Sequence, residues 1–128
     1  MTRLLQLLLA LPLLASLACD DPTTIRTCTN AQVCVCEQED VCDFSCQGAG
    51  CAFVCRDNSS CILTCDGGGC DAQITTTIDA EFSCAGGGCT LNCQGTGSCT
   101  LYDCTQGCAL ECSEDSVCTN TCTDPTCS

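Results

Sequence analysis

The chain has 128 residues, of which 21 are cysteine, three are phenylalanine, one is tyrosine and none is tryptophan. So little large apolar surface cannot form an ordinary hydrophobic core, and the composition predicts one small domain braced by disulfide bonds. The formal net charge is −13, with no histidine. This charge argues against binding to nucleic acid or to anionic membrane surfaces, and the lack of histidine removes the commonest general base.

Residues 1–18, MTRLLQLLLALPLLASLA, place one arginine before a leucine-rich run that ends in small residues. This pattern is typical of a secretory signal peptide. The run is short and is interrupted by Pro12, which argues against a permanent membrane span. We therefore expect an exported protein, whose cysteines meet an oxidising environment.

The residue that follows is Cys19. From Met1 to Cys19 the chain resembles bacterial lipoprotein precursors, with Ser16 and Leu17 where the lipobox usually has leucine and a small residue. The resemblance implies that Cys19 is lipidated and anchors the protein to a membrane of the cell envelope, with residues 19–27 as a polar tether. Plain secretion after cleavage at Ala18 is the alternative. Lipidation would leave 20 cysteines, an even number, for pairing.

Residues 28–128 form a cysteine-rich repeat, in which a Cys-x-apolar-x-Cys cassette recurs and alternate copies start at a constant offset of 19 in the numbering. In an extended strand this spacing sends both cysteines and the middle residue to one face. Two strands and two loops per repeat predict an all-β fold, a parallel β-solenoid of two facing sheets with about five coils. The segment 28–41 is abbreviated, as in a capping coil. The cassettes start at Cys42, Cys51, Cys61, Cys70, Ala80, Cys89, Cys99, Cys108 and Cys118.

Strand geometry decides which cysteines can pair. Two cysteines of one cassette would lie about 13 Å apart, whereas a disulfide needs Cα atoms within about 7 Å. A bridge across the loop between consecutive strands is allowed, and Ile74 and Ala80, which replace two partners under this rule, are both apolar. The predicted pairs are Cys28–Cys34, Cys36–Cys42, Cys46–Cys51, Cys55–Cys61, Cys65–Cys70, Cys84–Cys89, Cys93–Cys99, Cys104–Cys108, Cys112–Cys118 and Cys122–Cys127.

The loops fall into two alternating sets. One set has glycine just before the next strand, which predicts tight turns with a positive φ angle at Gly50, Gly69, Gly88 and Gly107. The other set is longer and more varied, and is the better candidate for a ligand-facing edge. In that set Arg56 stands one full repeat after Glu37, so the repeat places these two side chains next to each other.

No nucleophile elbow and no phosphate-binding loop with lysine is present, so we predict no enzyme and no cofactor; only carboxylate-based hydrolysis is left open by the 16 acids. The composition also resembles that of cysteine-rich bacterial lipoproteins. We expect a monomeric, rigid structural or binding module at the cell surface. Its expected partners are a membrane, through the lipid, and a protein, cationic or glycan surface, with no nucleic acid.

Two alternatives concern metals and ice. Acidic loops such as residues 113–117 could bind Ca²⁺, and reduced cysteines could bind metal as thiolates, although only Cys34-Val-Cys36 has the Cys-x-Cys form. The architecture also resembles the small insect antifreeze solenoids with Thr-Cys-Thr repeats. An ice face needs two threonine columns, whereas here one column contains Asp43 and Glu81. The other is the hydroxyl column Ser45, Thr64, Ser83, Tyr102 and Thr121.

Overall fold

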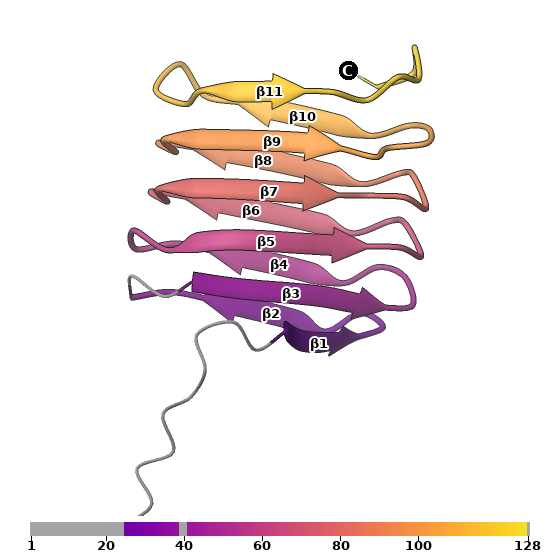
Figure 1. The fold of residues 1–128 in the computed structure, drawn as a ribbon, viewed down its shortest axis with the longest axis horizontal. Coiled ribbons are helices and arrows are strands. Elements are labelled where there is room, and N and C mark those ends of the chain that lie inside the picture. Colours follow the sequence, from indigo (N-terminus) through magenta and orange to yellow (C-terminus); the bar gives the residue numbers. More distant parts are fainter. Residues whose placement is uncertain (1–24, 39–40, 128) are drawn as a thin grey trace, which may run out of the picture.

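The computed structural model describes residues 25–38 and 41–127, and it confirms the predicted all-β solenoid. Two parallel sheets face each other, and their strands run in opposite directions (Figure 1). Sheet A contains β1 (Ile25–Thr29), β3 (Val41–Gln47), β5 (Ser60–Cys65), β7 (Asp79–Ser83), β9 (Ser98–Tyr102) and β11 (Cys118–Asn120). Sheet B contains β2 (Val33–Cys36), β4 (Ala52–Cys55), β6 (Asp71–Thr75), β8 (Thr90–Gln94) and β10 (Ala109–Cys112).

The register follows the sequence repeat. In sheet A, Cys42 pairs with Cys61 and Phe82 with Leu101, each one full repeat apart in the sequence. The exception is β1, where Ile25 pairs with Asp43 at an offset shorter by one. The described part of the solenoid therefore includes Ile25, inside the segment expected to be a tether, because the edge of β3 can hydrogen-bond to these residues.

The interior between the sheets is filled by the cassette residues. Phe44 of sheet A stacks on Phe53 of sheet B with ring centroids 6.3 Å apart, and Phe53 meets Phe82 edge to face at 5.9 Å. Ala72, next to Phe53 in sheet B, is fully buried and supplies the small side chain in this aromatic layer. Offset-stacked and edge-to-face contacts of this kind are the favoured geometries of aromatic pairs.

Nine of the ten predicted disulfides are present, with Cα atoms 6.0 to 6.6 Å apart. In eight of them both cysteines are buried. The ninth, Cys112–Cys118, lies at the C-terminal end, where Cys112 is exposed. The sulfur atoms thus line the two edges of the interior, and they occupy the space that large apolar side chains fill in other small domains.

The predicted bridge between Cys122 and Cys127 is wrong for this structure, in which both are free thiols. In each of the nine bridged loops, the second cysteine lies in a strand or directly precedes one. That strand is paired with a neighbouring coil, and this pairing fixes the position of the cysteine. Cys127 lies in none of the described strands. The pairing rule requires a strand before the loop and a strand after it. Here β11 precedes the loop, and the structure describes no strand after it.

The first coil differs from the predicted truncation. The segment around Cys34 forms a full strand, β2, and Cys34 itself pairs with Phe53 in the central column of sheet B. The Cys28–Cys34 bridge therefore fills a position that an apolar residue fills elsewhere. Polar residues end the central column of sheet A, with Arg26 next to Phe44 and Asn120 next to Leu101, both exposed.

The paired loss of two cysteines is accommodated as expected. Ile74 stands between Cys55 and Cys93 in sheet B, and Ala80 stands between Cys61 and Cys99 in sheet A. Both are fully buried. One large and one small apolar side chain therefore replace the two cysteines of a bridge at this position.

Among the described residues, no helix is long and apolar enough to cross a membrane.

Candidate functional site

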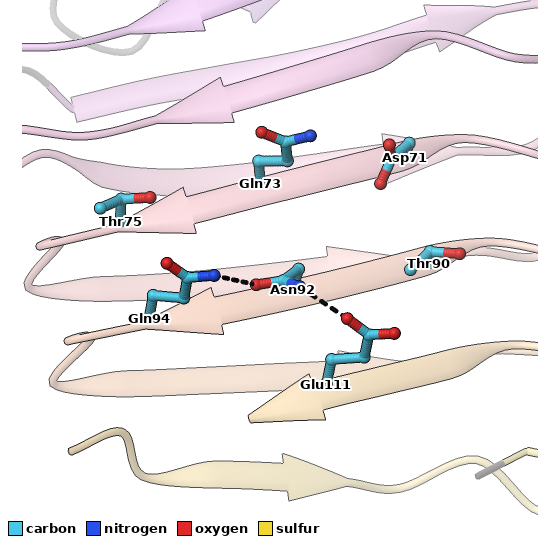
Figure 2. A pocket seen from close by; sticks show the side chains of 7 residues that line it. All are labelled: Asp71, Gln73, Thr75, Thr90, Asn92, Gln94 and Glu111. Atoms are coloured by element: carbon cyan, nitrogen blue, oxygen red, sulfur yellow. Dashed lines mark hydrogen bonds between the residues drawn. The ribbon is translucent and has the colours of Figure 1, made fainter. Parts of the chain in front are cut away.

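A shallow polar groove of about 350 Å³ runs across the outer face of sheet B. Strand alternation explains it, since the cysteines and apolar residues of β6, β8 and β10 point inward and the residues between them point to solvent. Figure 2 shows these side chains standing on three neighbouring strands. The lining residues are Asp71, Gln73, Thr75, Thr90, Asn92, Gln94 and Glu111.

Amide and carboxylate groups form a short hydrogen-bonded chain in this groove. Asn92 donates from Nδ2 to Oε2 of Glu111 over 2.6 Å and accepts at Oδ1 from Nε2 of Gln94 over 3.2 Å (Figure 2). Gln73 lies one coil away in register with Asn92, and Asp71 lies in register with Thr90. Within the described part of the chain, neither Asp71 nor Gln73 makes a side-chain hydrogen bond, so their polar atoms are open to a ligand.

The charge of the groove is negative. Its two ionisable side chains are the carboxylates of Asp71 and Glu111, and none of the lining residues is a cation. Such a surface can accept hydrogen bonds from hydroxyl or ammonium groups and donate them through its amides. The alternation of inward and outward residues in the sequence predicts that the groove residues face outward. It does not identify them as a binding surface.

The glycine loops form one edge of the solenoid, and their predicted positive φ angles are confirmed, for example 72° at Gly50 and 66° at Gly69. The loops also hydrogen-bond to each other, since Gly69 N donates to Gly87 O over 2.9 Å. A Cβ atom on Gly86 would lie 2.3 Å from Gly68 N. Glycine is therefore required here for the close stacking of loops as well as for turn geometry.

The longer loops form the opposite edge, and the predicted pair is confirmed there. Arg56 Nε donates to Oε2 of Glu37 over 2.9 Å, and this hydrogen bond raises the pKa of the guanidinium. The same edge also turns small hydroxyl residues inward. Ser59, Thr77 and Thr96 are buried, and the hydroxyl of Thr77 has no hydrogen-bond partner among the described residues. Nothing in the sequence signals these inward turns, because the loops share no apolar pattern.

The hydroxyl column stands in register on the outer face of sheet A. Ser45 pairs with Thr64, Thr64 with Ser83 and Ser83 with Tyr102. Ser83 is only 8% exposed. The neighbouring column pairs Asp43 with Ile62 and Ile62 with Glu81, so acidic and aliphatic side chains stand where a second threonine column would be needed.

The two free thiols lie at the C-terminal end, beyond β11. The Sγ atoms of Cys122, Cys127 and the bridged Cys104 lie within 4.8 Å of one another. Burial raises the pKa of the Cys122 thiol, and the neighbouring Cys127 raises it further, against a hydrogen bond with the Cys104 backbone that lowers it. The raised pKa favours the protonated thiol over the thiolate, which is the reactive form.

Three other groups of three sulfur atoms are equally close, but all their members are bridged. A bridged sulfur is not a thiolate ligand, so Cys122 and Cys127 are the only thiols that the described residues offer to a metal. The predicted signal peptide, residues 1–18, and the predicted lipidation site, Cys19, lie outside the described residues.

The fold and the groove together define a disulfide-braced parallel β-solenoid with a flat polar face. Comparison with protein-family models, with curated proteins and with solved structures finds no match to this chain.

Proposed function

We propose that this chain is an exported, lipid-anchored protein of the cell envelope, and that it serves as a rigid binding module without catalytic activity. The lipid on Cys19 would hold the module at a membrane, and the groove on sheet B would bind a polar surface. The ligand class that we propose is a glycan. Hydroxyl groups match the carboxylate and amide groups of Asp71, Gln73 and Asn92.

The observation that carries the proposal is the groove on a covalently fixed sheet. Its three strands are parallel and in register, so the column Gln73, Asn92 and Glu111 places a polar side chain on each coil at the strand spacing of about 4.8 Å. A repeating polymer would meet similar donors and acceptors on successive coils. Bridges beneath the sheet keep this array in place before a ligand arrives, which reduces the entropy lost on binding.

Rigidity also supports a role outside the cell. Eight bridges are buried at both cysteines, and buried bridges of this kind persist where the environment is oxidising. The net charge of −13 keeps such a module soluble and repels it from the anionic surface of a membrane. We expect the lipid, and not the solenoid, to make the membrane contact.

Binding to purified cell-wall glycans tests the groove. We expect Gln73→Ala and Asp71→Ala each to weaken binding about 2- to 10-fold, since one net hydrogen bond is worth about 0.5–1.5 kcal/mol. Thr64→Ala on the outer face of sheet A is the matched control and should leave binding unchanged. Equal binding by the wild type and both groove variants would show that the glycan does not use this face.

The anchor needs a separate measurement. Mass spectrometry of the mature protein from its native host should find a diacylglycerol-modified cysteine at its N-terminus, and Cys19→Ser should release the protein from the membrane fraction. A mature chain with unmodified Cys19 would support plain secretion and would leave the binding proposal standing.

A further inference from the structure

We infer that Cys122 and Cys127 form a redox-active dithiol, which exchanges with external disulfides at the C-terminal end of an otherwise closed set of bridges. The pair differs from every other pair of cysteines in the described chain. Both members are free thiols, both are half-buried, and neither lies in a strand. Their Sγ atoms lie within 4.8 Å of each other, so a small local movement brings them to bonding distance.

Hydrogen bonds of a turn hold the two cysteines, and no described strand follows the loop between them. Cys122 follows the last described strand closely, and its N–H donates to Oδ1 of Asn120 over 2.9 Å. Cys127 ends a turn in which its N–H donates to the Asp124 carbonyl over 3.1 Å. The turn is tied to the neighbouring coil by a bond in which Gly107 N donates to Oγ1 of Thr126 over 2.9 Å. Elsewhere paired strands on both sides of the loop hold the cysteines.

The packing beneath the pair shields the neighbouring bridge from external reagents. The Sγ of Cys104 lies within 4.8 Å of both thiols, but its bridge to Cys108 is buried, with Cys104 only 3% and Cys108 only 1% exposed. An external disulfide therefore reaches the pair first. One thiolate attacks a sulfur of that disulfide and releases one small thiol. The second thiolate then displaces the other small thiol, giving the Cys122–Cys127 bridge and two released thiols.

This step balances without a further reactant. The two protein thiols lose two electrons and two protons, and the external disulfide gains them. The reverse reaction with a small dithiol regenerates the open pair. The inference is independent of the glycan proposal, because the thiols lie beyond β11 while the groove lies across β6, β8 and β10.

Partial reduction of the folded, purified protein tests the inference, once oxidised glutathione has closed the bridge between Cys122 and Cys127. Limiting dithiothreitol should reduce the Cys122–Cys127 pair first, and alkylation followed by peptide mapping should find label on these two residues alone. The bridge Cys112–Cys118 is the internal control, because it lies at the same end and Cys112 is exposed. Label on Cys112 and Cys118 at the same rate, or loss of the folded circular dichroism signal before any label appears, would overturn the inference.

Re-oxidation provides the second measurement. Oxidised glutathione added to the reduced pair should release two molecules of glutathione per chain and leave no adduct on the protein. Cys127→Ser and Cys122→Ser should each retain a stable glutathione adduct, because the resolving thiol is missing. Adducts that persist on both cysteines of the wild type would show that the pair does not close, and would overturn the inference.

Discussion

The central coils and the C-terminal coil are built from the same repeat but differ in what surrounds it. In the centre, Phe82 and Leu91 are fully buried, and the Cys84–Cys89 bridge between their strands is buried as well. At the C-terminal end Leu110 is half-buried, Cys112 is exposed and Asn120 replaces the apolar middle residue. The contribution of a cassette to the stability of the domain therefore depends on its position. A coil stacked on each side is needed to bury its sulfur atoms and its side chains.

Full reduction should erase the difference between the two regions. Without bridges the chain retains too few large apolar residues to fold, so we expect complete unfolding in the presence of excess reductant. Circular dichroism with and without reductant measures this effect, and resistance to protease should be lost in parallel. A reduced chain that keeps its β signal would mean that the strands hold the fold without sulfur.

Truncation of a core side chain should separate the regions clearly. We expect Phe82→Ala to lower the free energy of unfolding by about 3–5 kcal/mol, because it removes an aromatic contact and leaves a cavity. Leu110→Ala should cost less than about 2 kcal/mol, since its site is already half open to water. Denaturant titration of both variants makes the comparison, and equal losses would contradict the difference in burial.

Restoring the lost bridge should strengthen the centre. The double substitution Ile74→Cys with Ala80→Cys should close a loop of the same kind as Cys55–Cys61, a gain of about 2 kcal/mol in the chain-entropy model. Loss of the isoleucine side chain offsets about half of this. We expect a net gain of about 1 kcal/mol by denaturant titration. Ile74→Cys alone is the control and should be destabilised.

The smallest effect is expected at the C-terminal end. Asn120→Ala removes a hydrogen bond between its side chain and Cys122 N, in a position exposed to water. We expect a loss of less than about 1 kcal/mol in global stability. The same variant should increase the rate at which Cys122 is alkylated, because the backbone next to the thiol loses its support. An unchanged alkylation rate would mean that this hydrogen bond does not order the end of the chain.

Most of the fold could be predicted from spacing alone. The constant repeat interval, the inward cysteines and the paired replacement at Ile74 and Ala80 are sufficient to predict strand order, register and nine bridges. These features depend on the period of a strand and on the reach of a disulfide, which are local geometric limits. They do not depend on distant packing, and for this reason a single sequence is enough.

The ends and the site could not be predicted in the same way. The strand β1 pairs out of step with the repeat and carries Arg26 at a middle position, so it has no cassette by which to be recognised. The open thiol pair depends on the position of Cys127 outside the described strands. The groove depends on polar side chains that vary from coil to coil, and the sequence shows their alternation without showing which of them meet.

Because the register is constant, the height of the stack of coils is set by the number of repeat units. Each strand pairs only with the strands one coil before and after it, so one whole repeat unit could be duplicated or deleted without changing the strand pairing elsewhere in the described chain. Each added unit would raise the stack of coils by about 4.8 Å. Gain or loss of repeat units would therefore change the height of the solenoid in equal steps.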